Sequence, residues 1–281
     1  MLNGTTVFTD ADNVAPIGRF GFSDKSYLLK KLYEADSIYK ATGKIEDYSD
    51  YGAMLIYNGQ YLEGKRVFQE IESKSPGLYA TAANLGTTYE ILGINDSAYF
   101  WINKALGINP KSHQGSEWIH LKILEAKIKS NNDHTYFQNH SILSLDFGHT
   151  EIPENRSKLD LEVLRDQLYH QLNERMTFIK PKDLIVGQLL FDLGNVNAIT
   201  RDVKSGLQVF EVAKEYGFQS KLLDKREKHF KSLQRTAEFR NHTEGWAREN
   251  PAKAVLISAT LFIALLAGIF LIIKRFRKGK I

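Results

Sequence analysis

The chain has 281 residues, of which 43% are hydrophobic and 25% charged, a composition that is typical of a globular protein and excludes a disordered one. Six of its 37 basic residues lie at or beyond Lys253, so residues 1–251 carry 31 basic and 33 acidic residues. A nearly neutral charge over these residues disfavours binding to nucleic acid. The lack of cysteine excludes a disulfide framework, a thiolate metal site and a cysteine nucleophile.

The first segment, residues 1–22, contains glycine and proline but has no helical period, and we expect an extended, loosely attached arm. Ser23-Asp24 then supplies an N-cap, and the helix that follows ends at Gly43. Its apolar positions are Tyr27, Leu28, Leu32, Ala35, Ile38 and Tyr39. We expect this helix to cover the open face of a first repeat.

Two segments, Tyr48–Pro76 and Ala82–Pro110, match each other at a spacing of 34 residues. The matching pairs are Tyr51 with Leu85, Gly52 with Gly86, Leu55 with Tyr89, Gly64 with Ala98, Phe68 with Ile102, Ile71 with Ala105 and Pro76 with Pro110. Small residues let the two helices of a hairpin approach, large residues fill the seam, and proline ends the second helix. The pattern resembles the tetratricopeptide repeat (TPR) family, although Tyr48 and Ala82 replace the early tryptophan of that family.

A third unit from Ser116 keeps apolar residues on its first helix but has His120 where the family has glycine. Its second helix, Thr135–Leu143, is short. The repeat pattern therefore predicts TPR-like repeats over residues 23–143. The next segment, residues 144–158, contains Gly148 and Pro153 among polar residues and is predicted to be a loop.

Residues 159–250 are predicted to form divergent helical repeats and a stalk. A helix over Leu159–Phe178 is followed by a hairpin of Pro181–Leu193 and Ala198–Tyr216, broken at Gly194-Asn195. The charged segment from Lys221 to Arg240 is also expected to be helical and to lead through Trp246 to the bilayer.

Residues 251–273 are expected to form one transmembrane helix, because Ala254–Ile273 is a run of twenty uncharged residues. The basic tail, residues 274–281, favours a cytoplasmic C-terminus and an extracytoplasmic repeat domain. No secretory signal pattern follows Met1, so either Met1 is not the natural start or the protein is tail-anchored with the repeats in the cytoplasm. Thr260, Ala264 and Gly268 recur every four residues, a spacing that also suits a homodimer of this helix.

No motif for catalysis or for cofactor binding is present in the sequence. It has no P-loop, no dinucleotide-binding glycine pattern and no nucleophile elbow. No two of the eight histidines are three or four residues apart, which disfavours a helical metal site. We therefore expect no enzymatic activity, no cofactor and no bound metal.

The TPR resemblance implies that the first helix of each repeat lines a concave groove. Carried over residue by residue, this register places in the groove Asp50, Ala53, Tyr57, Asn84, Thr87, Glu90 and, from the third unit, Glu117, Leu121 and Glu125. The groove lacks the lysines and arginines with which some family members bind a peptide carboxylate, and it is mildly acidic. We expect it to bind a basic or neutral extended segment of a partner protein, the alternative being that these acids form a solvated surface.

The sequence thus predicts an all-α protein, a TPR-like helical-hairpin solenoid followed by a single transmembrane helix. The predicted function is that of a membrane-anchored scaffold for protein–protein interaction. The alternative is a sensor or regulatory subunit of a membrane signalling system that acts through a separate effector.

Overall fold

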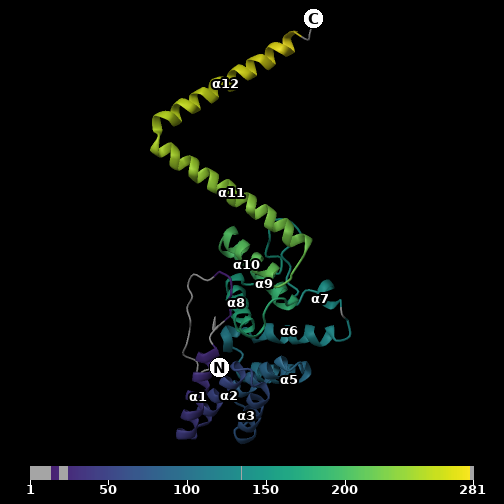
Figure 1. Cartoon of the computed structure of the whole chain (residues 1–281). Helices are drawn as coiled ribbons and strands as arrows, with labels where there is room; N and C mark the ends of the chain where they lie inside the picture. Colours follow the sequence, from purple (N-terminus) through teal and green to yellow (C-terminus); the bar gives the residue numbers. More distant parts are fainter. Residues whose placement is uncertain (1–13, 19–24, 134, 279–281) are drawn as a thin grey trace. The chain divides into compact units, whose positions relative to one another are not determined.

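The computed structural model of the protein describes residues 14–18, 25–133 and 135–278. In these ranges the regular elements are helices, and no strand occurs. The chain divides into two compact units, residues 1–229 and residues 230–281 (Figure 1). The first unit contains the helical repeats and the second contains the apolar C-terminal helix, so the predicted all-α class is confirmed.

The N-terminal part of the first unit is a series of helices in which each packs against the next. These are α1 (Lys25–Thr42), α2 (Ile45–Tyr57), α3 (Tyr61–Lys74), α4 (Tyr79–Ile91) and α5 (Asn95–Ile108). The predicted N-cap Ser23-Asp24 lies outside the described residues. The turns that follow α2 and α4 place Gly59 and Gly93 at φ of 79° and 76°, a conformation that glycine adopts without strain. Helices packed in consecutive pairs are compatible with a helical-repeat solenoid.

The glycines that matched between the two repeats lie where two helices come closest. A Cβ atom on Gly52 of α2 would lie 2.8 Å from Val67 of α3, and one on Gly86 of α4 would lie 2.4 Å from Ile102 of α5. Phe68 and Ile102, which fill these seams, are almost wholly buried. The 34-residue spacing therefore reflects one packing arrangement used twice.

The third unit departs further from a repeat than expected. A short 3-10 turn, η1 (Ser112–Gly115), precedes α6 (Glu117–Ser130), and the partner helix is only α7 (Tyr136–Asn139). The chain turns extended at His140, so Ile142 and Leu143 join the core from an irregular segment, where a helix to Leu143 had been predicted. Residues 144–158 contain no regular element, in agreement with the predicted loop.

Three helices follow the loop in the first unit. They are α8 (Leu161–Phe178), α9 (Leu184–Thr200) and α10 (Val203–Glu215). Helix α9 runs through Gly194-Asn195, where the sequence predicted a break, and ends at Thr200 instead. A Cβ atom on Gly194 would lie 2.4 Å from the ring of Phe210 in α10. Gly194 is thus needed for close helix packing within a hairpin, and it does not end a helix.

The main hydrophobic core of this unit lies among α6, α8, α9 and α10, with Leu168, Leu172, Leu189 and Leu193 fully buried. A second cluster joins α1, α2 and α3 around Phe68 and Ile71. The described part of the predicted loose arm packs on the first core, where the Val14 carbonyl accepts a hydrogen bond of 3.0 Å from Asn197 Nδ2. Residues 14–18 are therefore attached to the repeat unit.

Helix α11 (Lys221–Glu249) starts in the first unit and continues into the second, where α12 (Pro251–Lys278) follows. In α12 the stretch Pro251–Ile269 is long and apolar enough to cross a membrane, with a mean hydropathy of 2.2 and none of it buried in the protein. This agrees with the predicted span at the C-terminus. The last residues of the basic tail, 279–281, lie outside the described ranges.

Candidate functional site

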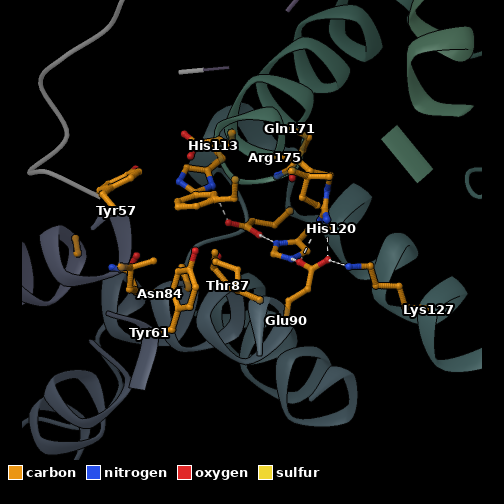
Figure 2. Close-up of a pocket in the computed structure, with 18 residues that line it drawn as sticks. Tyr57, Tyr61, Asn84, Thr87, Glu90, His113, His120, Lys127, Gln171 and Arg175 are labelled. Atoms are coloured by element: carbon orange, nitrogen blue, oxygen red, sulfur yellow. Dashed lines mark hydrogen bonds and ion pairs between the residues drawn. The ribbon is translucent and has the colours of Figure 1, made fainter. Parts of the chain in front are cut away.

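A cavity of about 300 Å³ lies in the repeat unit, on the side formed by the first helices of successive pairs. Figure 2 shows it bordered by α2, α4 and α6, with residues of α8 closing it from a distant part of the sequence. Its lining includes Ala53, Tyr57, Tyr61, Asn84, Thr87, Glu90, His113, Glu117, His120, Lys127, Gln171, Arg175 and Phe178.

Five of the six residues predicted to form the partner-binding groove line this cavity. They are Tyr57, Asn84, Thr87, Glu90 and Glu117. The sixth, Asp50, lies on α2 two turns before Tyr57, is half-buried, and is not among the lining residues. Ala53 also lines the cavity, whereas Leu121 and Glu125 do not. The structure thus brings two of the three positions expected from the first unit, all three from the second and one of three from the third to this cavity, and the partner helix of the third unit is only the four-residue α7.

Glu90 is at the centre of a buried ion-pair network. Its carboxylate accepts hydrogen bonds from Arg175 Nη1 (2.6 Å) and Nη2 (3.2 Å) and from Lys127 Nζ (2.6 Å), and it lies 2.7 Å from His120 Nε2. The side chains of Glu90 and Arg175 are each only 6% exposed. These contacts join α4, α6 and α8 through one carboxylate.

Glu117 extends the network to the start of α6. Its Oε1 atom is 2.8 Å from His113 Nδ1 and accepts a 2.7 Å hydrogen bond from the Tyr79 hydroxyl. Its Oε2 atom lies 3.8 Å from His120 Nδ1. The interactions drawn in Figure 2 therefore form one chain along the cavity wall, from His113 through Glu117, His120 and Glu90 to Lys127.

The network determines the charges of its members. Burial alone would raise the pKa of Glu90, but Arg175, His120 and Lys127 outweigh it and hold this pKa well below its usual range. Burial likewise opposes ionisation of Glu117, whose pKa is lowered by its two histidine neighbours. For His120 burial lowers the pKa, and the two carboxylates outweigh it and raise the pKa. Both glutamates are thus charged, and His120 favours the protonated form.

The other end of the cavity is apolar and aromatic. Tyr57 of α2 stacks on Phe178 of α8 with ring centroids 5.3 Å apart. Tyr61, Ile91 and Ile179 complete this side. The cavity therefore has a charged, hydrogen-bonded wall facing an aromatic wall, the combination found in many ligand sites.

Helix α8 is a fixed wall of the cavity, because its opposite face is part of the main core. Leu164, Leu168, Leu172 and Met176 are buried there. Two glutamines attach it further: Gln167 Oε1 accepts from Trp118 Nε1 (2.9 Å), and Gln171 Nε2 donates to Ser116 Oγ (3.1 Å). A movement of α8 that widened the cavity would therefore break these contacts.

Sequence reasoning missed the contribution of α8 and the cations that pair with the groove acids. One signal was available, because Arg175 falls three residues after Leu172 and one before Met176, within the apolar stripe of its helix. A charged residue at such a position needs a buried partner. Nothing in the sequence identified that partner as Glu90, which lies 85 residues earlier.

Within the described ranges there is no group of three or more histidine, aspartate or glutamate side chains placed to hold a metal ion. No protein-family model matches the chain, and no match was found among curated proteins or solved structures. The function is therefore argued from the geometry of the cavity.

Proposed function

We propose that the protein is a membrane-anchored scaffold that binds a segment of a partner protein in the cavity bordered by α2, α4, α6 and α8. The observation that carries this proposal is a cavity with one aromatic and one polar wall, whose side chains are held in place by buried ion pairs. Side chains fixed before binding lose little conformational entropy when a partner binds, which favours affinity.

The charges within the cavity favour a neutral segment over a basic one. Of the four acids in the predicted groove only Glu90 and Glu117 line the cavity, and both carboxylates already contact cationic or hydrogen-bonding groups of the same chain. A basic side chain of a partner would have to displace Arg175 or Lys127 from Glu90. A segment without charge at this position binds without breaking a buried pair.

The proposed anchor is α12, and the cluster of Lys274, Arg275, Arg277, Lys278 and Lys280 after its apolar run favours a cytoplasmic C-terminus. In this orientation the repeats lie outside the cytoplasm. Protease treatment of intact cells is expected to digest the repeats and to leave the C-terminal end protected. Protection of the repeats instead would establish the opposite orientation.

Binding is tested by capture of partners with the tagged full chain, followed by quantitative mass spectrometry. Tyr57→Ala removes one ring of the aromatic wall, and truncation of a central aromatic contact typically weakens an interface by about tenfold or more. Tyr33→Ala is the matched control, since Tyr33 is 65% exposed on α1 and does not line the cavity.

The proposal predicts that specific partners captured by the full chain and by Tyr33→Ala are depleted with Tyr57→Ala. If Tyr57→Ala retains the same partners at the same abundance, the cavity is not their binding site. The captured partners also distinguish a structural scaffold from a regulatory subunit, because a kinase, protease or transcription regulator would favour regulation.

A further inference from the structure

A second cavity, of about 500 Å³, lies in the repeat unit and shares no lining residue with the first. It is bordered by α7, the irregular segment that follows α7, helix α9 and the turn that joins α10 to α11. Four aromatic rings and five ionisable side chains line it: Phe137, Phe147, Phe191 and Phe218, and His140, Asp146, His149, Asp192 and Arg226. Its volume is within the usual range for ligand pockets.

The carboxyl group of Asp192 is buried at this cavity without a partner. Asp192 is 5% exposed, and neither oxygen of its carboxyl group accepts a hydrogen bond from the described residues. Its Oδ2 atom is shielded, whereas Oδ1 keeps accessible surface, and the residue lines the second cavity. A buried polar group without a partner is unfavourable and uncommon. Asp192 Oδ1 is therefore the atom at which a ligand would complete the site.

The nearest cation, Arg226 of α11, does not supply the missing partner. All three of its guanidinium nitrogens donate to other oxygens at 2.7–3.1 Å: the carbonyls of Phe147, Gly148 and Thr150 and the side chain of Asn195. Burial raises the pKa of Asp192 to about 8, and the charge of Arg226 offsets this only in part. Asp192 thus lacks a cation in direct contact.

The first cavity shows how this chain stabilises another buried carboxylate. Glu90, at 8% exposed, accepts a 2.6 Å hydrogen bond from Lys127 Nζ in addition to its contact with Arg175, and its pKa is lowered. Asp192 is buried as deeply as Glu90 but has no such lysine. One carboxylate between two cations is therefore an arrangement that the chain already contains, and Arg226 does not exclude a second cation at Asp192.

We propose that the second cavity binds a primary alkylammonium group, which donates a hydrogen bond to Asp192 Oδ1 while its alkyl stem packs against the phenylalanine rings. Aromatic faces attract a cation and also bury its apolar stem. When the ammonium binds, Asp192 ionises, and its proton passes to the solvent. A lysine side chain of a partner protein and a free alkylamine both carry this group. The site is separate from the cavity of the proposed function and does not depend on it.

The test uses the full chain in phosphatidylcholine nanodiscs and isothermal titration calorimetry with n-butylamine, which reproduces the end of a lysine side chain. The heat of titration into empty nanodiscs is subtracted. n-Butanol and butyrate have a similar stem but end in a neutral and a negative group. We expect butylamine to bind at least about tenfold more tightly than either, because only the ammonium forms a charge-assisted hydrogen bond with ionised Asp192.

Binding should also release a proton. Because the pKa of Asp192 is about 8, its carboxyl group is mostly protonated at pH 7, and about 0.9 proton should be released for each butylamine bound. Binding heats compared between phosphate and Tris buffers measure this number. His140, Asp146, His149 and Arg226 also line the cavity, and Asp192→Asn separates their contribution from that of Asp192.

Asp192→Asn keeps the size of the side chain but removes its charge, and it should weaken butylamine binding by at least about tenfold and abolish the proton release. Asp166→Asn is the matched control, since the Asp166 side chain is 59% exposed, contacts Arg165 and lines neither cavity. N-acetyl-lysine-N-methylamide distinguishes the two sources. Binding comparable with that of butylamine assigns the site to a lysine of a partner protein, and its exclusion assigns the site to a free alkylamine.

The inference is overturned if butanol or butyrate binds as tightly as butylamine, or if butylamine binds without release of a proton. Unchanged binding to a folded Asp192→Asn chain also overturns it. So does a lack of saturable binding, which would indicate that the cavity holds water only. The ligand comparison and the proton count need no variant, so they remain decisive if Asp192→Asn does not fold.

Discussion

Replacing Glu90 by glutamine should destabilise the repeat unit by about 3–5 kcal/mol, the usual range for loss of one partner of a buried ion pair. The structure supports this range because the side chains left behind cannot regain water. Arg175 is 6% exposed and His120 is 9% exposed, whereas Lys127, at 20%, can turn toward solvent. A neutral amide can still accept one hydrogen bond, but it cannot balance a buried guanidinium. Chemical denaturation of the full chain in detergent micelles, followed by helical circular dichroism, measures the effect.

Two further variants separate the network from a general effect of the substitution. Glu34→Gln removes an exposed carboxylate beside Lys31 on α1 and should leave the unfolding midpoint unchanged. Adding Arg175→Met to Glu90→Gln removes the uncompensated cation and should recover part of the lost stability. The reasoning would be refuted if Glu90→Gln cost less than about 1 kcal/mol, or if the double variant were no more stable than Glu90→Gln alone.

Three further predictions follow from pKa values and from helix packing. Burial alone would lower the pKa of His120, but Glu90 and Glu117 outweigh it and raise this pKa. Protonated His120 therefore stabilises the fold fully below about pH 6.5, and this contribution is lost as the pH rises through the raised pKa. His120→Gln should abolish this part of the decline in the unfolding midpoint. Burial raises the pKa of Asp192 to about 8, so stability also falls as the pH rises from about 4 to 8, and Asp192→Asn should raise the midpoint at pH 8 while leaving it unchanged at pH 4. Gly86→Ala places a Cβ 2.4 Å from Ile102 and should lower the free energy of unfolding by about 1–3 kcal/mol in denaturation experiments. Gly107→Ala has open space around its Cβ and should raise the free energy of unfolding by about 0.5–1 kcal/mol. Equal effects of the two substitutions would contradict the packing argument.

The sequence predicted the first two hairpins well because their positions are fixed by local rules. Gly52 and Gly86 mark the closest helix approach, and Pro76 and Pro110 follow the second helices. Such features depend only on residues within one repeat. The same register was sufficient to place five of the six groove residues on one cavity.

The errors in the prediction arose where tertiary packing overrides local propensity. Gly194 was taken as a helix break, but the ring of Phe210 occupies the space where its side chain would be, so the glycine belongs inside α9. Likewise, the short α7 could not be foreseen, because Ile142 and Leu143 are apolar enough to continue a helix and are buried in an irregular segment instead. The pairing of Glu90 in the cavity depends on Arg175 of α8, and no pattern within one repeat specifies where α8 packs.

The contact between Glu90 and Arg175 also has a consequence for the order in which the chain folds. In an open repeat array each unit is stabilised by its immediate neighbours, and folding can proceed from one end to the other as the chain is synthesised. Here an acid of the second hairpin pairs with Lys127 and His120 of α6, but its two-nitrogen contact with Arg175 needs a residue 85 positions further along. We therefore expect the second hairpin to gain its full stability only after α8 has been synthesised and has packed against it.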